Sequence, residues 1–574
     1  MVCMSFIFRF IKFIFKYILF TLFLGGLFYG YTLLPKRQKE NAILTLRIED
    51  SKLEDNQQQM LPFMKKGYSV EQLRQIIKSA TRDPKIKGLV LELYGTQMGL
   101  GQVDELAKQL ALFKAQKKPI FVFADTLGRE CGTATAAYWL ASYADEVYVS
   151  PMGTLNFSGF AMSRYFLKSL FDQYAIKGTT ERRDEYKGML DPYLFDEFSK
   201  PVRENITNVL EDIMNIIIAE VAKNRRISSE KVKELVNQCP LWGGTIAAKE
   251  KLIDGALYFD QDNPPEALKK LVKDTGAKFI SAKNYPLYPQ DKQKEKIAVI
   301  YLSGQIVRYT PGGTPFCQQP ISDFWVQKLL NRAKNEKYKA VVLRVNSGGG
   351  DVIGSFNIHN SIQQFRRKKI PVVMSMGDVC ASGGYLIATA TDYTVAHPCT
   401  ITGSIGVACI RPYLKDFSKK FNVNFDGIKV GGNSTFYDVT QEFTEAQKER
   451  FSQYVDFVYD EFLQKVSDAR KIDKEKLRKD IAGGRIWSGQ QAKELGLVDA
   501  LGGLDMAVTK AADLAKVADY EVVVLPTGGI ADIISEWQDT GMSSMLLSHM
   551  IVQFRTMTEQ ACRTTTKTEM SLQF

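Results

Sequence analysis

The stretch AVVLRVNSGGGD, residues 340–351, decides the fold. A short apolar run of strand-forming residues ends in a glycine-rich turn, and an amphipathic helical pattern follows from about residue 353 to 368. Another apolar run, PVVMSM at 371–376, comes next. Short apolar strands that alternate with helices of this length indicate βαβ units, so the sequence predicts a mainly parallel sheet covered by helices.

The same order of elements occurs a second time, nearer the N-terminus. Residues 88–94 (GLVLELY) and 119–123 (PIFVF) read as strands on either side of a helix at 103–117. The two copies predict an α/β protein built from two tandem, duplicated domains. Equivalent residues keep a near-constant separation: Pro119 and Pro371 are 252 apart, Tyr138 and Tyr385 are 247 apart, and Trp242 and Trp487 are 245 apart.

Composition shifts predict the domain boundaries. The stretch 281–295 (SAKNYPLYPQDKQKE) is polar, contains two prolines and reads as a linker. Residues 41–280 then form the first domain and residues 296–525 the second. Residues 526–574 match nothing in the first copy and form a C-terminal extension to which no role is assigned.

Residues 1–40 carry a predicted membrane anchor. The run YILFTLFLGGLFYGYTLL, residues 17–34, has no charge and is just long enough to cross a bilayer as a helix. Basic residues precede it and no small-residue cleavage motif follows, which favours an uncleaved transmembrane helix over a signal peptide. Lys36, Arg37 and Lys39 follow the run, so the distribution of charge leaves the orientation open.

The overall composition is that of an ordinary folded protein, with 45% apolar and 24% charged residues. The net charge of +11 is spread along the chain among acids, which indicates solvated surface and disfavours a nucleic-acid partner. None of the eight cysteines forms a CxxC pair or has the spacing of a zinc site, so we expect no metal and no cofactor. The sequence does not define a disulfide pairing.

Two glycine-rich turns occur in the second copy and not in the first. The turn at 346–351 lacks the Lys-Ser/Thr pair of a phosphate-binding loop, and its consecutive glycines could instead aim a backbone N–H at an oxyanion. The turn at 378–385 (DVCASGGY) places Ser382 between a strand and a helix. Such a serine is either a helix cap or a nucleophile. The glycines after Ser382 favour the nucleophile, because a cap does not require them.

Three segments of the second copy together resemble one known family. SGGGD, ASGGY and TGSIG (402–406) are similar to the C-terminal half of the bacterial signal peptide peptidases of the SppA, or protease IV, family in their long duplicated form. The resemblance covers roughly residues 1–525. It implies two ClpP/crotonase-like spiral domains, Ser382 as nucleophile, and the amides of Gly349 and Gly383 as oxyanion donors. The family's turn usually reads Ser-Pro-Gly-Gly, whereas this chain has Gly348 in place of the proline.

A serine nucleophile needs a base. The chain has three histidines. His359 lies in the predicted helix after the first glycine-rich turn and His549 in the C-terminal extension, whereas His397 follows Ser382 by 15 residues and stays open as an alternative base. The resemblance instead implies a lysine from the first half, and the matching stretch EYKG at 185–188 supplies Lys187. Burial in a dry site would lower the pKa of such a lysine and make it a base.

The two copies differ at the positions that matter for this chemistry. The second copy has STFY at 434–437 and no lysine at the point that matches Lys187. The first copy has Thr135 where the second has Ser382. One site built across both halves is therefore predicted, and the resemblance implies that Ser404 orients the lysine amine. We predict that Cys380 and Cys399 are small buried residues without a catalytic role.

The resemblance implies a membrane-anchored serine endopeptidase that digests hydrophobic peptides such as cleaved signal peptides. Its expected place is the bacterial inner membrane, with a single span, contact with membrane lipid through the anchor, and catalytic domains on the periplasmic side. It also implies a ring- or bowl-like homo-oligomer, such as a tetramer. Two other functions stay open at this point: a crotonase-like acyl-CoA enzyme and a catalytically dead membrane scaffold.

Overall fold

The computed structural model describes residues 40–48, 68–95, 98–128, 134–285, 294–308 and 320–526. The predicted anchor at 17–34, most of the linker and nearly all of the C-terminal extension lie outside these residues. Within the described ranges, none of the helices combines the length and the apolar character of a membrane span. The anchor therefore stays a prediction.

The first half of the chain forms one six-stranded sheet in which every neighbouring pair is parallel. Its central strands are buried on both faces, which explains their continuous apolar sequence. In spatial order the strands are β8 (Gly255–Ala256), β4 (Glu146–Val149), β3 (Ile120–Ala124), β2 (Ile86–Leu93), β1 (Ala42–Ile48) and β9 (Lys278–Ser281).

The second half repeats this arrangement in an eight-stranded sheet. The strand β14 extends to Ala381, although the sequence predicts its end at residue 376. In the added part, Val379 pairs with Ile401 of β16. Along the main path the strands are β18 (Ile486–Ser488), β16 (Ile401–Gly403), β14 (Val372–Ala381), β13 (Ala340–Ser347), β10 (Glu295–Ser303) and β20 (Tyr520–Leu525). Beside them, β15 (Tyr393–Ala396) pairs with β14 and β19 (Ala500–Leu501) pairs with β15.

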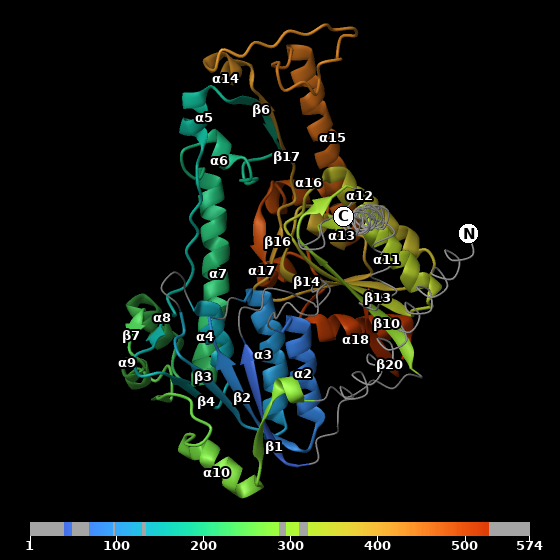
Figure 1. The fold of residues 1–574 in the computed structure, drawn as a ribbon. Coiled ribbons are helices and arrows are strands. Elements are labelled where there is room, and N and C mark those ends of the chain that lie inside the picture. The colour runs from blue at the N-terminus through green and yellow to red at the C-terminus, as the bar shows by residue number, and fades with distance from the viewer. Residues whose placement is uncertain are drawn as a thin grey trace, which may run out of the picture.

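Helices cover both sheets and correspond between the halves (Figure 1). In the first half they are α2 (Val70–Arg82), α3 (Leu100–Ala115), α4 (Thr135–Ala141), α7 (Lys200–Arg225), α8 (Ser229–Gln238), α9 (Gly244–Lys249) and α10 (Glu266–Thr275). In the second half they are α11 (Asp323–Asn335), α12 (Val352–Arg366), α13 (Gly383–Ala388), α15 (Glu445–Arg470), α16 (Lys474–Lys476), α17 (Gly489–Glu494) and α18 (Leu504–Ala515). The helices α7 and α15 each have 26 residues.

The two halves exchange structure at the upper end of the molecule. There β6 (Lys177–Arg182) of the first half pairs antiparallel with β17 (Ala408–Tyr413) of the second. The helix α7 rises from the first half to this pair (Figure 1). On its way, the side-chain amide of Asn205 both donates to and accepts from the backbone of Ile486, each at 2.9 Å. The strand pair and the contact of Asn205 together hold the loop that follows β6 against the second half.

Each half also caps a helix of the other. Asp378, near the end of β14, accepts from the backbone N–H of Gly101 at 2.7 Å in the first turn of α3. Glu105 of α3 accepts from the N–H of Leu504 at 2.8 Å, at the start of α18. A carboxylate at a helix N-terminus satisfies free donors and is favoured by the helix dipole. These reciprocal caps fix α3 against the second sheet.

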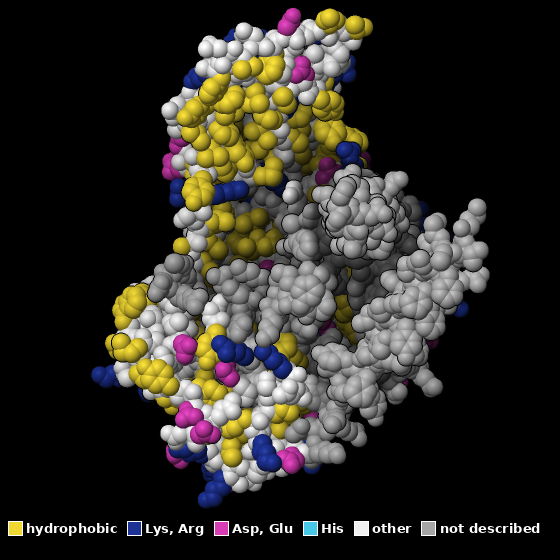
Figure 2. Space-filling view, in the orientation of Figure 1, with side chains coloured by type: hydrophobic (Ala, Val, Ile, Leu, Met, Phe, Trp, Pro, Cys, Tyr) yellow, Lys and Arg dark blue, Asp and Glu magenta, His cyan; other side chains and the backbone are white. Residues whose placement is uncertain are grey.

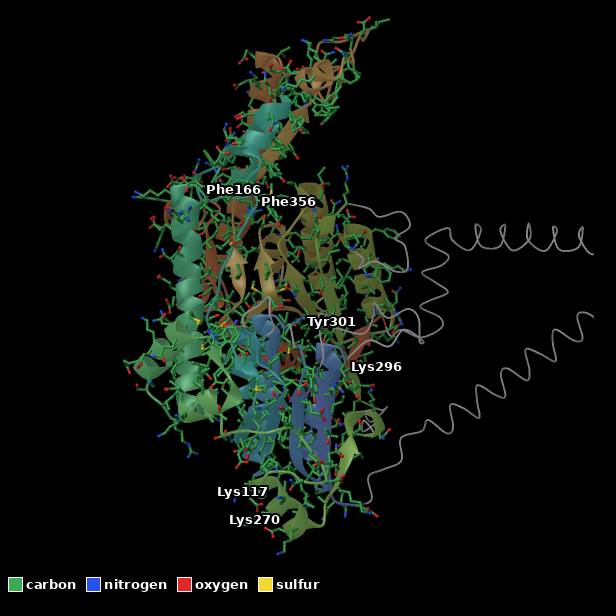
Figure 3. All side chains as sticks on the ribbon, turned by 60° about the vertical axis from the view of Figure 1, so that its left-hand side comes forward. Lys117, Phe166, Lys270, Lys296, Tyr301 and Phe356 are labelled. Atoms are coloured by element: carbon green, nitrogen blue, oxygen red, sulfur yellow. The ribbon has the colours of Figure 1, made fainter. Side chains whose placement is uncertain are left out.

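A buried network of charges continues this interface. On α2, Arg74 binds Glu71 of its own helix and also Asp505 of α18, the latter at 2.6 Å. Tyr301 of β10 donates to Glu71 at 2.7 Å. Figure 3 places Tyr301 between the two halves, far from Lys117 at the lower end of the molecule. Removing one partner of such a buried pair leaves an uncompensated charge, so the network holds the halves in one register.

His397 lies at the centre of a second part of this network. Its Nδ1 is 2.5 Å from Asp104, and its Nε2 faces Glu105 at 3.3 Å and Arg344 at 3.0 Å. Burial alone would lower the pKa of His397, but its hydrogen bonds to the two carboxylates outweigh burial and raise it. For Glu105, burial would raise the pKa, but the hydrogen bond from His397 and the charge of Arg344 hold it far below its usual value.

We predict that His397→Gln lowers the free energy of unfolding by about 3 kcal/mol, because a buried pair is broken. A raised pKa means that the folded state holds the proton more tightly, so the contribution of His397 is complete below about pH 6.5 and is lost as pH rises through its folded pKa. The penalty of the substitution should therefore shrink with rising pH. Denaturant midpoints measured across pH test this prediction.

His359 provides a control, because its contribution to stability should change with pH in the opposite direction. Burial lowers its pKa to about 4. Wild-type stability therefore falls as pH drops from about 6.5, by up to about 1.4 kcal/mol per pH unit, because the unfolded state takes up the proton first. The penalty of His359→Gln should shrink with falling pH. Equal pH trends for the two variants would contradict the assignment of charge.

Candidate active site

Ser382 sits on a sharp turn between a strand and a helix. The strand β14 ends at Ala381 and α13 begins at Gly383. Ser382 itself has φ 54° and ψ −121°, a strained conformation for a residue with a side chain. Its N–H donates to the carbonyl of Gly403 at 2.9 Å, which anchors the turn to β16. Strain held by the surrounding structure is typical of a functional residue.

Lys187 reaches Ser382 from the other half of the chain. It lies in the loop that follows β6, and its Nζ is 3.0 Å from Oγ of Ser382. The residue is only 6% exposed. Burial lowers the pKa of Lys187 to about 7, and no carboxylate of the described residues lies within ion-pair distance to restore it. An amine with this pKa is neutral in part at neutral pH and can accept a proton.

Ser404 holds the same amine from a second direction. Its carbonyl oxygen lies 2.8 Å and its Oγ 2.9 Å from Nζ of Lys187. The N–H of Ser404 donates to the carbonyl of Arg485 at 2.6 Å, which fixes the turn after β16. A neutral amine has two protons and one lone pair. If Ser404 accepts both protons, the lone pair is directed at the hydroxyl of Ser382.

The two predicted oxyanion donors lie side by side but are not equivalent. Gly383 is the first residue of α13, where backbone N–H groups have no acceptor within the helix. Gly349 has φ 97°, and a Cβ added there would lie 2.6 Å from the nitrogen of Gly383. The N–H of Gly349 donates to Oγ of Ser347 at 3.1 Å. It would have to share or exchange this bond to bind an oxyanion.

A cavity of about 510 Å³ opens beside Ser382 and Lys187. The aromatic ring of Phe356, on α12, is one of its walls, and Figure 3 shows this residue at the level of the upper end of the second sheet. The other apolar side chains that line the cavity come from both halves, and they include Met162, Met189, Val379, Leu386, Val407 and Phe462. The cavity can therefore accommodate an apolar group next to the reactive hydroxyl.

Among the described residues, neither His397 nor Cys380 is placed to activate or replace the hydroxyl of Ser382, and His549 lies outside the described residues. Both ring nitrogens of His397 are used in the network between the halves. Burial raises the pKa of the Cys380 thiol to about 12, and its Sγ faces the carbonyl of Gly384 at 3.4 Å. In the first copy, the buried hydroxyl of Thr135 is occupied by the backbone of Gly159.

Gly484 was not identified from the sequence as part of the site. Gly484 lies directly behind Lys187: a Cβ added to Gly484 would come within 2.6 Å of the backbone nitrogen and Cβ of that residue. The pair Gly483–Gly484 was visible as a third glycine-rich turn, AGGR at 482–485. Nothing in its composition linked it to a lysine about three hundred residues earlier, and only the fold does so.

Comparison with known proteins identifies the family. The model of Peptidase family S49 matches residues 112–272 and 364–518, one segment in each half, and a Clp protease model matches residues 313–400. Protease 4 of Haemophilus influenzae is 30% identical over 456 residues, which are 76% of this chain and 72% of that protein. The chain belongs to peptidase family S49. It is a serine peptidase with an α/β, ClpP-like fold.

Two further matches were found. A relative named "Serine protease SPPA, chloroplastic", from Arabidopsis thaliana, is 27% identical over 522 residues, which are 87% of this chain and 74% of that one. Among solved structures, a mutant of ClpP1 from Listeria monocytogenes aligns with a TM-score of 0.25 and 16% identity, over 37% of this chain and 94% of its own. Family membership favours a peptidase over an acyl-CoA enzyme and a dead scaffold.

We predict that Cys380→Ala retains nearly full peptidase activity, although Cys380 is two residues from Ser382. Its buried thiol is protonated at neutral pH and cannot serve as a nucleophile. Turnover of a peptide substrate, measured beside thermal stability, tests this. Loss of activity in a variant that keeps wild-type stability would show that the thiol takes part.

Proposed function

We propose that this S49 peptidase is a membrane-anchored endopeptidase that uses a Ser–Lys dyad, with Ser382 as nucleophile and Lys187 as general base. The observation that carries the proposal is the 3.0 Å separation between Nζ of Lys187 and Oγ of Ser382. It is supported by the burial of Lys187 and by its lowered pKa. Ser404 orients the amine in this proposal.

In the proposed reaction, neutral Lys187 takes the proton of the Ser382 hydroxyl while Oγ attacks the carbonyl carbon of the scissile peptide bond. The negative charge that develops on the carbonyl oxygen faces the N–H of Gly383 and the start of α13, with Gly349 as second donor. The protonated Lys187 then gives its proton to the leaving amine. Water, deprotonated by Lys187, releases the acyl group from Ser382 and restores the hydroxyl.

Hydrophobic peptides are the substrates that this site fits best. The cavity beside Ser382 is lined mainly by apolar side chains, and burial of apolar surface is the main source of affinity for such a segment. The predicted anchor at 17–34 would hold the enzyme at a membrane, where cleaved signal peptides are released. We therefore propose signal peptides as substrates and the periplasmic side of a bacterial inner membrane as the place of action.

We predict that Ser382→Ala lowers peptidase activity by several orders of magnitude while the fold is kept. Lys187→Arg should be as inactive as Lys187→Ala, because a guanidinium stays protonated and cannot accept a proton. Wild-type kcat/KM should rise about tenfold per pH unit below about pH 7 and level off above it, because only neutral Lys187 is a base. Peptide turnover and labelling by a fluorophosphonate give these profiles.

Lys168→Arg is the matched control, since this lysine is half-exposed and pairs with Asp172 at a distance from the Ser382 cavity. It should keep wild-type turnover. Full labelling of Lys187→Arg, or a wild-type rate that does not change between pH 6 and 8, would refute the proposed base. Labelling of Ser382→Ala at the wild-type rate would refute the nucleophile.

An apolar face covers the upper lobe, which we define as β6, β17, α5 (Lys168–Tyr174), α6 (Asp191–Leu194) and α14 (Lys415–Lys420) with their connecting loops. Figure 2 shows hydrophobic side chains gathered over this lobe. Large exposed members include Tyr165, Met189, Phe425, Ile428 and Tyr437. Exposed patches of this kind mark sites of association. We propose that a second copy of the chain covers this face in a homo-oligomer such as a tetramer.

Paired substitution of Tyr165 and Ile428 by Glu should dissociate the oligomer, because a charge in a desolvated apolar contact is costly. These residues are 89% and 100% exposed in the single chain, so their replacement should not unfold it. Sedimentation of the full chain in detergent measures the effect. Trp242→Glu, at a 70% exposed residue of the lower part, is the control and should leave the assembly intact. An unchanged mass of the double variant would overturn this interface.

A further inference from the structure

The loop that carries Lys187 rests on a segment of the second half. The N–H of Tyr186 donates to the carbonyl of Gly483 at 3.2 Å, and the N–H of Gly484 donates to the carbonyl of Ile405 at 2.9 Å. The next residue of this segment, Arg485, accepts the N–H of Ser404. One short segment before β18 therefore positions both the proposed base and the serine that holds its amine.

The contact between this segment and Lys187 is backbone against backbone. Gly484 has φ +85°, and a Cβ added to it would lie 2.6 to 2.7 Å from the nitrogen, Cα and Cβ of Lys187. Gly406 borders the same side chain further out, since its added Cβ would lie 3.4 Å from Cδ. The position of the lysine side chain thus depends on how closely the two segments approach.

A buried hydroxyl adds a second hydrogen-bonded connection between the two segments. Tyr459, on α15, is 2% exposed. Its OH donates to the carboxylate of Asp184 at 2.6 Å and accepts the N–H of Gly483 at 3.1 Å. Asp184 lies three residues before Lys187, and Gly483 lies next to Gly484. Three parts of the chain meet at one oxygen atom, which does not contact the catalytic cavity.

The loop also separates two cavities of different character. On one side lies the mainly apolar cavity that contains Ser382 and Lys187. On the other lies a charged cavity of about 650 Å³, and Tyr186 lines both. The guanidinium of Arg485 stacks on the ring of Tyr186 at 3.9 Å. The charged groups that face the second cavity are Arg182, Asp184, Glu185, Glu475, Arg478, Lys479 and Arg485.

We propose that Tyr459 is a positioning residue, which through Asp184 and Gly483 holds the Lys187 loop closed against Gly484 and keeps water of the charged cavity away from the amine. The proposal rests on Lys187 as the base. Tyr459 acts through Lys187 and touches neither substrate nor reacting atoms. Without its hydroxyl, the loop loses the bridge from Asp184 to Gly483 and is left with the hydrogen bond from Tyr186 to Gly483, so that water gains access to the amine.

The test is the pH dependence of fluorophosphonate labelling by the full-length enzyme. In Tyr459→Phe, hydration should move the pKa of Lys187 back toward that of a free lysine. We expect the midpoint of the labelling profile to rise by about one pH unit, which lowers the rate at pH 7 about fivefold and leaves the rate at high pH nearly unchanged. Tyr454→Phe, at an exposed position of the same helix, should keep the wild-type profile.

Substitutions of Asp184 distinguish the role of its hydrogen bond to Tyr459 from the effect of its negative charge on Lys187. Asn accepts the same hydrogen bond and tolerates the φ of +63° found there, so Asp184→Asn should keep the wild-type midpoint. Asp184→Ala removes the acceptor and should shift the midpoint as Tyr459→Phe does. Asp184 is exposed, so this pair gives the answer even if Tyr459→Phe fails to fold. Equal shifts in Asn and Ala would show that charge acts instead and would overturn the proposal.

Two outcomes keep this inference distinct from the dyad itself. If Lys187→Ala labels at the wild-type rate, the dyad fails and the positioning role fails with it. If Lys187→Ala is inert while Tyr459→Phe and Asp184→Ala lose only stability and keep the wild-type midpoint, the dyad stands and the positioning role is overturned.

Discussion

The burial of one lysine amine, with no carboxylate partner among the described residues, is the constraint on which the rest of the structure depends. Taking a cation out of water is costly, and proteins avoid the cost by releasing the proton. For Lys187 that release would produce the proposed base, provided that the site stays dry. The surrounding structure must therefore supply acceptors for the neutral amine, which Ser404 does, and must exclude both water and carboxylates.

This constraint also explains why the halves are joined so firmly. A proton moves between groups only over a hydrogen-bond distance, yet Lys187 and Ser382 belong to different halves. The reciprocal helix caps of Asp378 and Glu105 and the buried network around His397 fix one half against the other. The attraction between the buried charges is largely offset by the cost of removing them from water, so such an interface gains little stability from them. Its benefit is a single relative position of the two halves.

Much of the fold could be predicted from the sequence, because each strand and helix is a local pattern. The apolar runs at β2, β3 and β13 and the amphipathic α12 lie where their sequence patterns predict them. Ser382 was recognisable from its turn, whereas Lys187 was not distinguishable from other lysines by composition and needed a family resemblance. Gly484 and Tyr459 were missed because their contacts join segments that are distant in sequence, and no local pattern encodes such a contact.

The duplication itself accounts for this division of labour. Both halves keep the same order of elements, so each has a loop after its β6 or β17 strand and a turn after its β3 or β14 strand. Because β6 pairs with β17, the loop of the first half that carries Lys187 lies next to the turn of the second half that carries Ser382. Once that arrangement exists, a nucleophile in the first half is redundant. The hydroxyl of Thr135 is a buried structural group bonded to Gly159, and the proposed dyad forms one asymmetric site across both halves.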